Sequence, residues 1–224
     1  MVNKKLKNRT DSIIVFVRYP RKGQVKTRLA KTTSLEFALN FYKLCAENLI
    51  RNIKKVPCVN RFIFYSNKNE KTEVISWLGN KFLFAPQEGD DLGSRMKNAF
   101  EKVFSAGSQK VIIVGTDIPD LSKEVIVKAF ELLDSYDVVI GPAKDGGYYL
   151  LGMKKMNAEL FEKIEYSTSS VLIETMTKIK ELNLNHHLLP ELNDIDTEKD
   201  LINWLNNDYN NPIKRDVKLE YKPA

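Results

Sequence analysis

A short segment rich in cations follows the first apolar run of the sequence. Five cations fall within the eleven residues from 18 to 28: Arg18, Arg21, Lys22, Lys26 and Arg28. Lys26 and Arg28 are two residues apart, so in an extended chain their side chains point the same way and can hold one phosphate chain. We therefore expect this loop, including Gly23, to bind phosphate, with Lys26 and Arg28 as the cations on which catalysis depends. The alternative is a solvated basic loop. The glycine spacing of a P-loop is missing.

A carboxylate follows a fully apolar run that is typical of a buried strand. Val111 to Val114 leads into Gly115-Thr116-Asp117-Ile118-Pro119-Asp120. In an open α/β sheet, ligands bind just beyond the carboxyl ends of the strands. Asp117 is therefore the first candidate for a ligand of a hard divalent cation, which takes oxygen ligands and bridges phosphates. We expect Asp120 instead to cap the helix that follows.

Two further stretches place carboxylates near expected strand or helix ends. Asp145-Gly146-Gly147 precedes an aromatic strand, and its paired glycines permit a ligand to approach the backbone closely. A type I′ hairpin turn explains the same three residues equally well. Asp194 and Asp196 precede a capped helix, and we expect one of them to complete a metal site with Asp117; the alternative is that both are turn and cap residues.

The elements that must position these groups alternate between strands and helices. This order is typical of an α/β protein with a mostly parallel sheet covered by helices on both faces. The predicted strands are Ser12–Arg18, Asn60–Ser66, Phe82–Ala85, Lys110–Gly115, Asp137–Gly141 and Tyr148–Gly152.

Three sets of apolar residues recur at helical spacing and predict three buried helix faces. The sets are Ala38, Tyr42, Cys45, Leu49 and Ile53; then Leu92, Met96, Ala99 and Val103; and then Val125, Ala129 and Leu132. Two helix starts carry the Ser/Thr-x-x-acid pattern of a capping box, Thr33 with Glu36 and Thr197 with Asp200.

Length and composition indicate one soluble domain. The chain has 224 residues, of which 43% are hydrophobic, enough for a large core without disulfides. We expect a polar lead-in over residues 1–11, the domain over 12–206 and a loose polar tail over 207–224. Cys45 and Cys58 show no metal-ligand or CxxC spacing, so we expect two buried thiols in a reducing, cytoplasmic setting.

Charge and hydropathy exclude two classes of partner. The net charge is +6, but part of the excess lies near the two ends of the chain, which does not favour nucleic-acid binding. The apolar runs are far shorter than the ~20 residues that a membrane span needs, and the apolar stretch after the basic N-terminus ends too early for a secretory signal. We expect neither a nucleic-acid nor a membrane partner, and the sequence predicts no oligomeric state.

Six stretches, in order and with ordinary spacing, carry a family resemblance. They are FVRYPRKGQVKTRLA, QEGDDLGSRM, GTDIPDL, GPAKDGGYYLLG, FEKIEYSTSSV and DIDTEKDL, and they run from about residue 13 to 205. Together they resemble the family called domain of unknown function 2064, also known as radical-SAM/selenodomain-associated or arsenosugar-biosynthesis transferases. This family is similar to the glycosyltransferase-A superfamily of nucleotide-sugar transferases and nucleotidyltransferases.

The resemblance implies a three-layer α/β/α sandwich, Rossmann-like and of the glycosyltransferase-A type. It implies that Asp117 binds Mg²⁺ or Mn²⁺, that Lys26 and Arg28 meet the nucleotide phosphates, and that Asp91, Gly93 and Arg95 approach the site. Two positions depart from the family pattern. Arg18 stands where Lys is usual, which keeps the charge, and Tyr166 replaces a usual Trp, which leaves the acceptor open.

Two reactions are expected from such a scaffold, and the sequence does not separate them. One transfers a nucleotidyl group from a nucleoside triphosphate to a small phosphorylated or sugar acceptor and releases pyrophosphate. The other transfers a sugar from a sugar nucleotide and releases a nucleoside diphosphate. The five loop cations favour the more highly charged triphosphate, whereas the family's naming favours glycosyl transfer. A third hypothesis, a catalytically inactive nucleotide-binding protein, is disfavoured because Asp117, Lys26 and Arg28 occur together.

Overall fold

A mixed seven-stranded sheet runs through the molecule. The structure is a computed structural model that describes residues 11–57, 59–207 and 210–222. The strands are β1 Asp11–Val17, β2 Val59–Tyr65, β3 Leu83–Pro86, β4 Lys110–Val114, β5 Val138–Pro142, β6 Tyr148–Met153 and β7 His186–Leu188. Their spatial order is β3-β2-β1-β4-β6-β5-β7. Every neighbouring pair is parallel except those made by β6, which runs antiparallel to β4 and β5.

The strand predictions are confirmed to within one residue at each end, and so is the mostly parallel mixed sheet. The reason is the burial of both faces of the central strands. In β4 the last four residues are all buried, and in β1 five of the seven are. A strand covered on both sides reads as a continuous apolar run, which makes its ends easy to find.

Helices and short 3-10 turns connect the strands. They are α1 Thr27–Ala30, α2 Leu35–Lys55, η1 Lys68–Glu70, α3 Lys71–Leu78, α4 Leu92–Ser105, α5 Lys123–Leu132, η2 Ala158–Phe161, α6 Val171–Glu181, α7 Glu198–Asn206 and α8 Lys214–Glu220. The predicted apolar face of α2 is buried throughout. In α4 the face is confirmed except for Leu92, which is exposed in the first turn. Within the described ranges, no helix is both long and apolar enough to cross a membrane.

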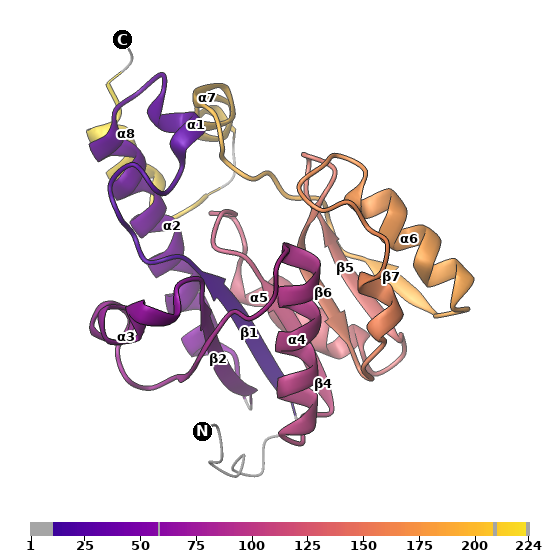
Figure 1. Cartoon of the computed structure of the whole chain (residues 1–224). Helices are drawn as coiled ribbons and strands as arrows, with labels where there is room; N and C mark the ends of the chain where they lie inside the picture. Colours follow the sequence, from indigo (N-terminus) through magenta and orange to yellow (C-terminus); the bar gives the residue numbers. More distant parts are fainter. Residues whose placement is uncertain (1–10, 58, 208–209, 223–224) are drawn as a thin grey trace.

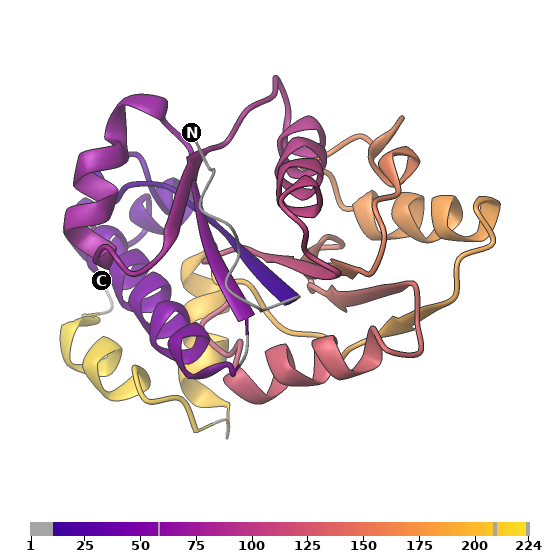
Figure 2. The same cartoon turned by 90° about the horizontal axis from the view of Figure 1, so that it is seen from below.

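The helices form a layer on each face of the sheet. One apolar cluster joins one face of the sheet to α2, α3 and α5, for example through Ile53, Val74 and Ile126. A second cluster joins the other face to α4, η2 and α6, through residues such as Phe100 and Ile179. Figure 2 shows α4 and α6 on one side of the sheet and α2 and α5 on the other. The result is the expected three-layer α/β/α sandwich.

A third cluster joins the C-terminal helices to the beginning of the chain. Trp204 of α7 and Ile213 and Val217 around α8 pack against Phe41 of α2 and Leu29 of α1. Figure 1 shows α7 and α8 beside α1 and the adjoining end of α2. The expected loose tail over 207–224 is therefore wrong for residues 210–222, because Ile213 and Val217 complete a core. The expected lead-in over residues 1–11 lies outside the described residues, apart from Asp11, which begins β1.

The capping predictions are half right. The capping box of Thr197 with Asp200 is confirmed at the start of α7. At α2 the cap is Ser34, which accepts a hydrogen bond from the Phe37 amide at 3.0 Å, and not Thr33. Thr33 instead donates its hydroxyl to the Leu29 carbonyl of the preceding helix. Thr33 and Ser34 are adjacent in sequence, and the conformation of the turn after α1 determines which of them caps α2.

We predict that α8 contributes to global stability. Ile213→Ala removes a side chain that is 1% exposed, and the cavity should cost about 2–5 kcal/mol of unfolding free energy in urea. Ile202→Ala is the matched control, because Ile202 is 41% exposed on α7 and should change stability little. Equal effects of the two substitutions would mean that the C-terminal segment does not form part of the cooperative core.

Candidate active site

Strand register gathers the candidate residues at one edge of the sheet. Val17 pairs with Tyr65, and Tyr65 pairs with Pro86, so β1, β2 and β3 end side by side. β4 ends two residues earlier along the sheet, where Val114 pairs with Val15 of β1. Because β6 is antiparallel, it begins at this edge, with Tyr148. Loops that are distant in sequence therefore meet above the same strand ends, as expected for an open α/β sheet.

These loops surround a cleft of about 1040 Å³, at the upper end of the volumes typical of small-molecule sites. Four cations line it: Arg18, Lys26, Arg28 and Arg95. Six carboxylates line it: Asp90, Asp91, Asp117, Asp145, Asp194 and Asp196. Among the described residues, the wall of the cleft thus carries more negative than positive side chains.

Lys26 lies between two of these carboxylates. Its Nζ is 2.9 Å from Asp117 Oδ1 and 2.9 Å from Asp196 Oδ1, and its side chain is only 2% exposed. Burial acts to lower the pKa of Lys26, but the charges of Asp117 and Asp196 outweigh burial and raise that pKa above its ordinary value. Lys26 is therefore a buried ammonium, and its charge is matched by two groups on the cleft wall.

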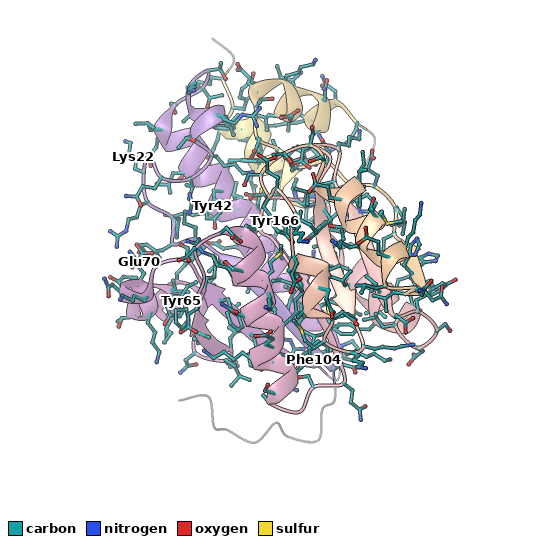
Figure 3. The ribbon with its side chains drawn as sticks, turned by 45° about the vertical axis from the view of Figure 1, so that its right-hand side comes forward. Lys22, Tyr42, Tyr65, Glu70, Phe104 and Tyr166 are labelled. Carbon is teal, nitrogen blue, oxygen red and sulfur yellow. The ribbon has the colours of Figure 1, made fainter. Side chains whose placement is uncertain are left out.

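Only part of the basic loop faces the cleft. Arg18, Lys26 and Arg28 line it. Arg21 pairs with the buried carboxylate of Glu70 at 2.7 Å, and Lys22 pairs with Glu36 at 3.0 Å. Figure 3 shows Lys22 and Glu70 toward the margin of the molecule, apart from Tyr42 and Tyr166 of the cleft wall.

Two expectations about this loop need correction. The structure does not bring Lys22 or Gly23 among the described residues that line the cleft; Gly23 has a φ of 77° in the turn before α1, which glycine adopts without strain. Lys26 and Arg28 were expected to point the same way from an extended chain. Lys26 instead has a left-handed backbone, with φ 46° and ψ 43°, and Arg28 is helical. Both still reach Asp196, because Arg28 Nη1 lies 3.7 Å from its Oδ2.

The carboxylates around Asp194 crowd one another. Burial raises the pKa of Asp194 to about 6, and the neighbouring charges of Asp145 and Asp196 add to the effect. The buried side chain of Ile195 anchors this segment in the core between Asp194 and Asp196, and the Ile195 amide donates to the Asp117 carbonyl at 3.4 Å. The structure thus brings the 194–196 segment beside the loop that carries Asp117, and the metal site predicted from Asp117 with Asp194 or Asp196 stays a prediction.

The Asp145-Gly146-Gly147 turn contributes two of its three residues to the cleft. Asp145 and Gly147 line it, and Gly146 does not. The turn links β5 to β6, but it is not of type I′, because only Gly146 has a positive φ, at 90°. Asp145 Oδ1 accepts from the Gly147 amide at 2.9 Å. A side chain on Gly146 would overlap the Ser169 carbonyl, so this glycine allows the 166–170 segment to pack against the turn.

Of the three residues at the start of α4 that the resemblance brought near the site, Gly93 is not among the described residues that line the cleft. Asp91 and Arg95 line the cleft, and Asp91 also caps α4 by accepting from the Ser94 amide at 2.7 Å. Gly93 is buried beneath Tyr166, and a Cβ there would overlap the Tyr166 ring. Gly93 therefore acts by permitting Tyr166 to approach α4, and Tyr166 forms part of the cleft wall.

Asp120 has a structural role that the sequence did not reveal. The expected helix cap is wrong, because Ser122 caps α5. Asp120 is buried and accepts hydrogen bonds from Trp204 Nε1 at 2.9 and 3.0 Å and from Asn211 Nδ2 at 2.7 Å. These bonds tie the loop that carries Asp117 to the C-terminal segment.

Two cleft residues at strand ends were missed. Ser66 follows β2 directly and Gln87 follows β3, and both line the cleft. The Gln87 amide group donates to the Phe64 carbonyl at 2.8 Å and to the Val17 carbonyl at 3.4 Å. The strand-end rule that selected Asp117 also applies to these two positions, but neither is charged.

The carboxylates of the cleft fit a divalent cation whose remaining ligands come from a bound substrate. In the part of the chain that the structure describes, no three His, Cys, Asp or Glu side chains gather closely enough to hold a metal by themselves. Asp117 and Asp196 nevertheless present oxygens to the same point, Lys26 Nζ, and their side chains are 53% and 38% exposed. One or two carboxylates, completed by substrate phosphates and water, are the usual protein ligands of Mg²⁺.

Comparison with known proteins identifies the family. The model of the family described as "Uncharacterized protein conserved in bacteria (DUF2064)" matches residues 49–168. The chain belongs to the DUF2064 family. A solved structure of a proposed nucleotide-diphospho-sugar transferase from Desulfovibrio desulfuricans G20 superimposes with a TM-score of 0.90 and 33% identity, covering 95% of each chain.

Two further matches are to proteins with other descriptions. The chain is 31% identical to a 2-phospho-L-lactate guanylyltransferase of Methanocaldococcus sp. (strain FS406-22), over 80% of this chain and 75% of the relative. A Mycobacterium tuberculosis H37Rv protein, solved as a complex with manganese, has a TM-score of 0.55 at 10% identity, covering 87% and 97% of the two chains. This last likeness shows a shared fold alone. Together with the sheet order, the matches confirm a glycosyltransferase-A-like fold.

We predict that Gly93→Ala destabilises the protein through Tyr166. Alanine in a helix is ordinarily favoured over glycine by about 1 kcal/mol, but here its Cβ overlaps the Tyr166 ring. Forcing extra volume into a packed site should cost about 1–3 kcal/mol, measured by urea unfolding. In a Tyr166→Ala background the same substitution should become neutral or stabilising. A stabilising Gly93→Ala in the wild-type background would contradict the packing of Tyr166 on α4.

We also predict that Asp194 lowers the free energy of unfolding as pH rises. Because its pKa is raised to about 6 from 3.8, the folded state holds a proton that the unfolded chain releases, and stability falls as pH rises from about 4 to about 6. With a chelator present, Asp194→Asn should match the wild type in unfolding free energy near pH 4 and exceed it near pH 7. A constant difference between the two proteins across this range would exclude the raised pKa.

Proposed function

We propose that this protein, a nucleotide-dependent transferase, transfers a nucleoside monophosphate from a nucleoside triphosphate to a small acceptor that carries a phosphate, and releases pyrophosphate. The observation that carries this proposal is the Lys26 ammonium between Asp117 and Asp196 at the strand ends. It combines a cation that can bind phosphate with two carboxylates that can ligate a metal ion, at one point of a cleft large enough for a nucleotide and an acceptor.

The reaction requires positioning and charge stabilisation rather than a protein nucleophile. An oxygen of the acceptor phosphate attacks the α-phosphorus, and the bond from that phosphorus to the β-phosphate oxygen breaks. Lys26, Arg28 and Arg18 line the cleft and are the cations proposed to bind the triphosphate and the departing pyrophosphate. Arg95, on α4, lines the same cleft as Tyr148 and Tyr166 and is the cation proposed to bind the acceptor's anionic group.

The charges of the cleft support a requirement for a divalent cation. With six carboxylates and four cations among the described residues of its wall, the cleft by itself repels a highly charged triphosphate. Mg²⁺ or Mn²⁺ held by Asp117 and Asp196 would supply the missing positive charge on the phosphates. Asp194, beside Asp196, is a candidate third ligand.

The relatives suggest the first substrates to try. The relative at 31% identity carries the name 2-phospho-L-lactate guanylyltransferase, and a second, from Methanocaldococcus jannaschii, carries the same name at 29% identity. GTP and 2-phospho-L-lactate are therefore the first donor and acceptor, with the other nucleoside triphosphates and phosphorylated hydroxy acids next.

Glycosyl transfer is the second candidate, and one observation favours it. The Desulfovibrio desulfuricans structure with a TM-score of 0.90 is described as a proposed nucleotide-diphospho-sugar transferase. The five cations of the basic loop favour a triphosphate over a sugar nucleotide less than the sequence suggested. Two of them, Arg21 and Lys22, are already paired with Glu70 and Glu36. Nucleotidyl transfer remains our proposal because the named guanylyltransferases match over four fifths of this chain.

We predict that the purified protein with Mg²⁺ or Mn²⁺ releases pyrophosphate from a nucleoside triphosphate only when a phosphorylated acceptor is present. Mass spectrometry should show the acceptor joined to a nucleoside monophosphate. Asp117→Asn should lower the rate by about 10²-fold or more, as expected when one group that stabilises the transition-state charge is lost. Asp134→Asn changes an exposed carboxylate outside the cleft and should leave the rate unchanged. Release of a nucleoside diphosphate from a sugar nucleotide, without pyrophosphate from any triphosphate, would overturn the nucleotidyl proposal.

A further inference from the structure

The position of Lys26 bears on how a metal ion gains access to its ligands. The Nζ atom contacts one oxygen of Asp117 and one of Asp196 at the same 2.9 Å distance. Its side chain is buried, whereas both carboxylates are accessible from the cleft. The ammonium thus lies at the point where the two proposed metal ligands converge.

The backbone holds Lys26 in this position. Its φ of 46° and ψ of 43° are left-handed values that non-glycine residues seldom adopt, and they occur directly before α1. The Ala30 amide donates to the Lys26 carbonyl at 2.9 Å, which makes Lys26 the first residue of the α1 hydrogen-bond pattern. Val25, its neighbour, is buried. The ammonium is therefore presented to the carboxylates by a fixed loop.

A positive charge at this point opposes the binding of a free divalent cation, since like charges at such short range repel strongly where water is excluded. A ligand that carries several phosphate charges changes this balance, because it offers Lys26 another anionic partner. Asp117 and Asp196 then become available as metal ligands, while the Lys26 ammonium pairs with a phosphate group.

We propose that Lys26 couples metal binding to nucleotide binding: it withholds Asp117 and Asp196 from a divalent cation until a phosphate chain draws the ammonium away. This inference rests on the nucleotide site proposed above. The protein then binds metal and nucleotide as a cooperative pair and binds the free metal weakly. By linkage, each of the two ligands tightens the other by the same factor.

The first test is a Mn²⁺ titration without nucleotide, followed by electron paramagnetic resonance. Lys26→Gln removes the charge but keeps an amide that can donate to a carboxylate. It should bind Mn²⁺ about tenfold or more tightly than the wild type, within the usual range of coupling factors. Arg28→Gln is the matched control, because Arg28 is 67% exposed and 3.7 Å from Asp196, and it should change Mn²⁺ affinity much less. Equal or weaker Mn²⁺ binding by Lys26→Gln would overturn the proposal.

A second measurement uses the wild-type protein, so that it does not depend on the folding of a variant. The ¹⁵N resonance of the Lys26 ammonium should shift when a non-hydrolysable GTP analogue is added without metal, because Nζ changes partners. An unchanged resonance at saturating analogue would contradict the proposal. If GTP is not the donor, the same titration with other triphosphates and with sugar nucleotides applies, and failure to shift with every nucleotide that binds is the contradicting result.

The test of the coupling and the test of the proposed reaction can fail independently of each other. Tighter Mn²⁺ binding by Lys26→Gln without pyrophosphate release by the wild type would support the coupling and exclude nucleotidyl transfer. Pyrophosphate release by the wild type, with no tighter Mn²⁺ binding by Lys26→Gln, would retain the reaction and exclude the coupling.

Discussion

The contact of one ammonium with two carboxylates brings together three distant parts of this chain. Lys26 follows β1, Asp117 follows β4, and Asp196 precedes α7. A buried ammonium is tolerated only when its charge is matched, so these three segments must close on one another for the strand-end loops to pack. The rest of the cleft is arranged around this contact.

The C-terminal third of the chain supports that arrangement. Ile195 is buried between Asp194 and Asp196, and its amide donates to the Asp117 carbonyl. Asp120 accepts from Trp204 and Asn211 and thereby fixes the other end of the same loop. The helices α7 and α8 thus support the cleft without lining it, and their apolar contacts with α1 and α2 form the third core cluster. In this way the stability of the C-terminal segment and the geometry of the site are connected.

The sequence predicted the scaffold well because its signals are local. Both faces of β1 and β4 are buried, so apolar runs marked the strands, and the strand-end rule then located Asp117. The partners of charged side chains could not be predicted in the same way, since they depend on contacts across the fold. Arg21 and Lys22 resembled Lys26 in sequence, yet they pair with Glu70 and Glu36 away from the cleft. Asp120 resembled a helix cap, and only its distant donors Trp204 and Asn211 reveal its role.

The most direct measurement of the central claim is a crystal structure with Mn²⁺ and a non-hydrolysable nucleoside triphosphate, phased to locate manganese by its anomalous scattering. The account predicts an anomalous peak within ligand distance of Asp117 and Asp196 and of phosphate oxygens, with Lys26 Nζ on a phosphate. A manganese bound elsewhere, or a triphosphate bound while Lys26 Nζ still contacts both carboxylates, would contradict it.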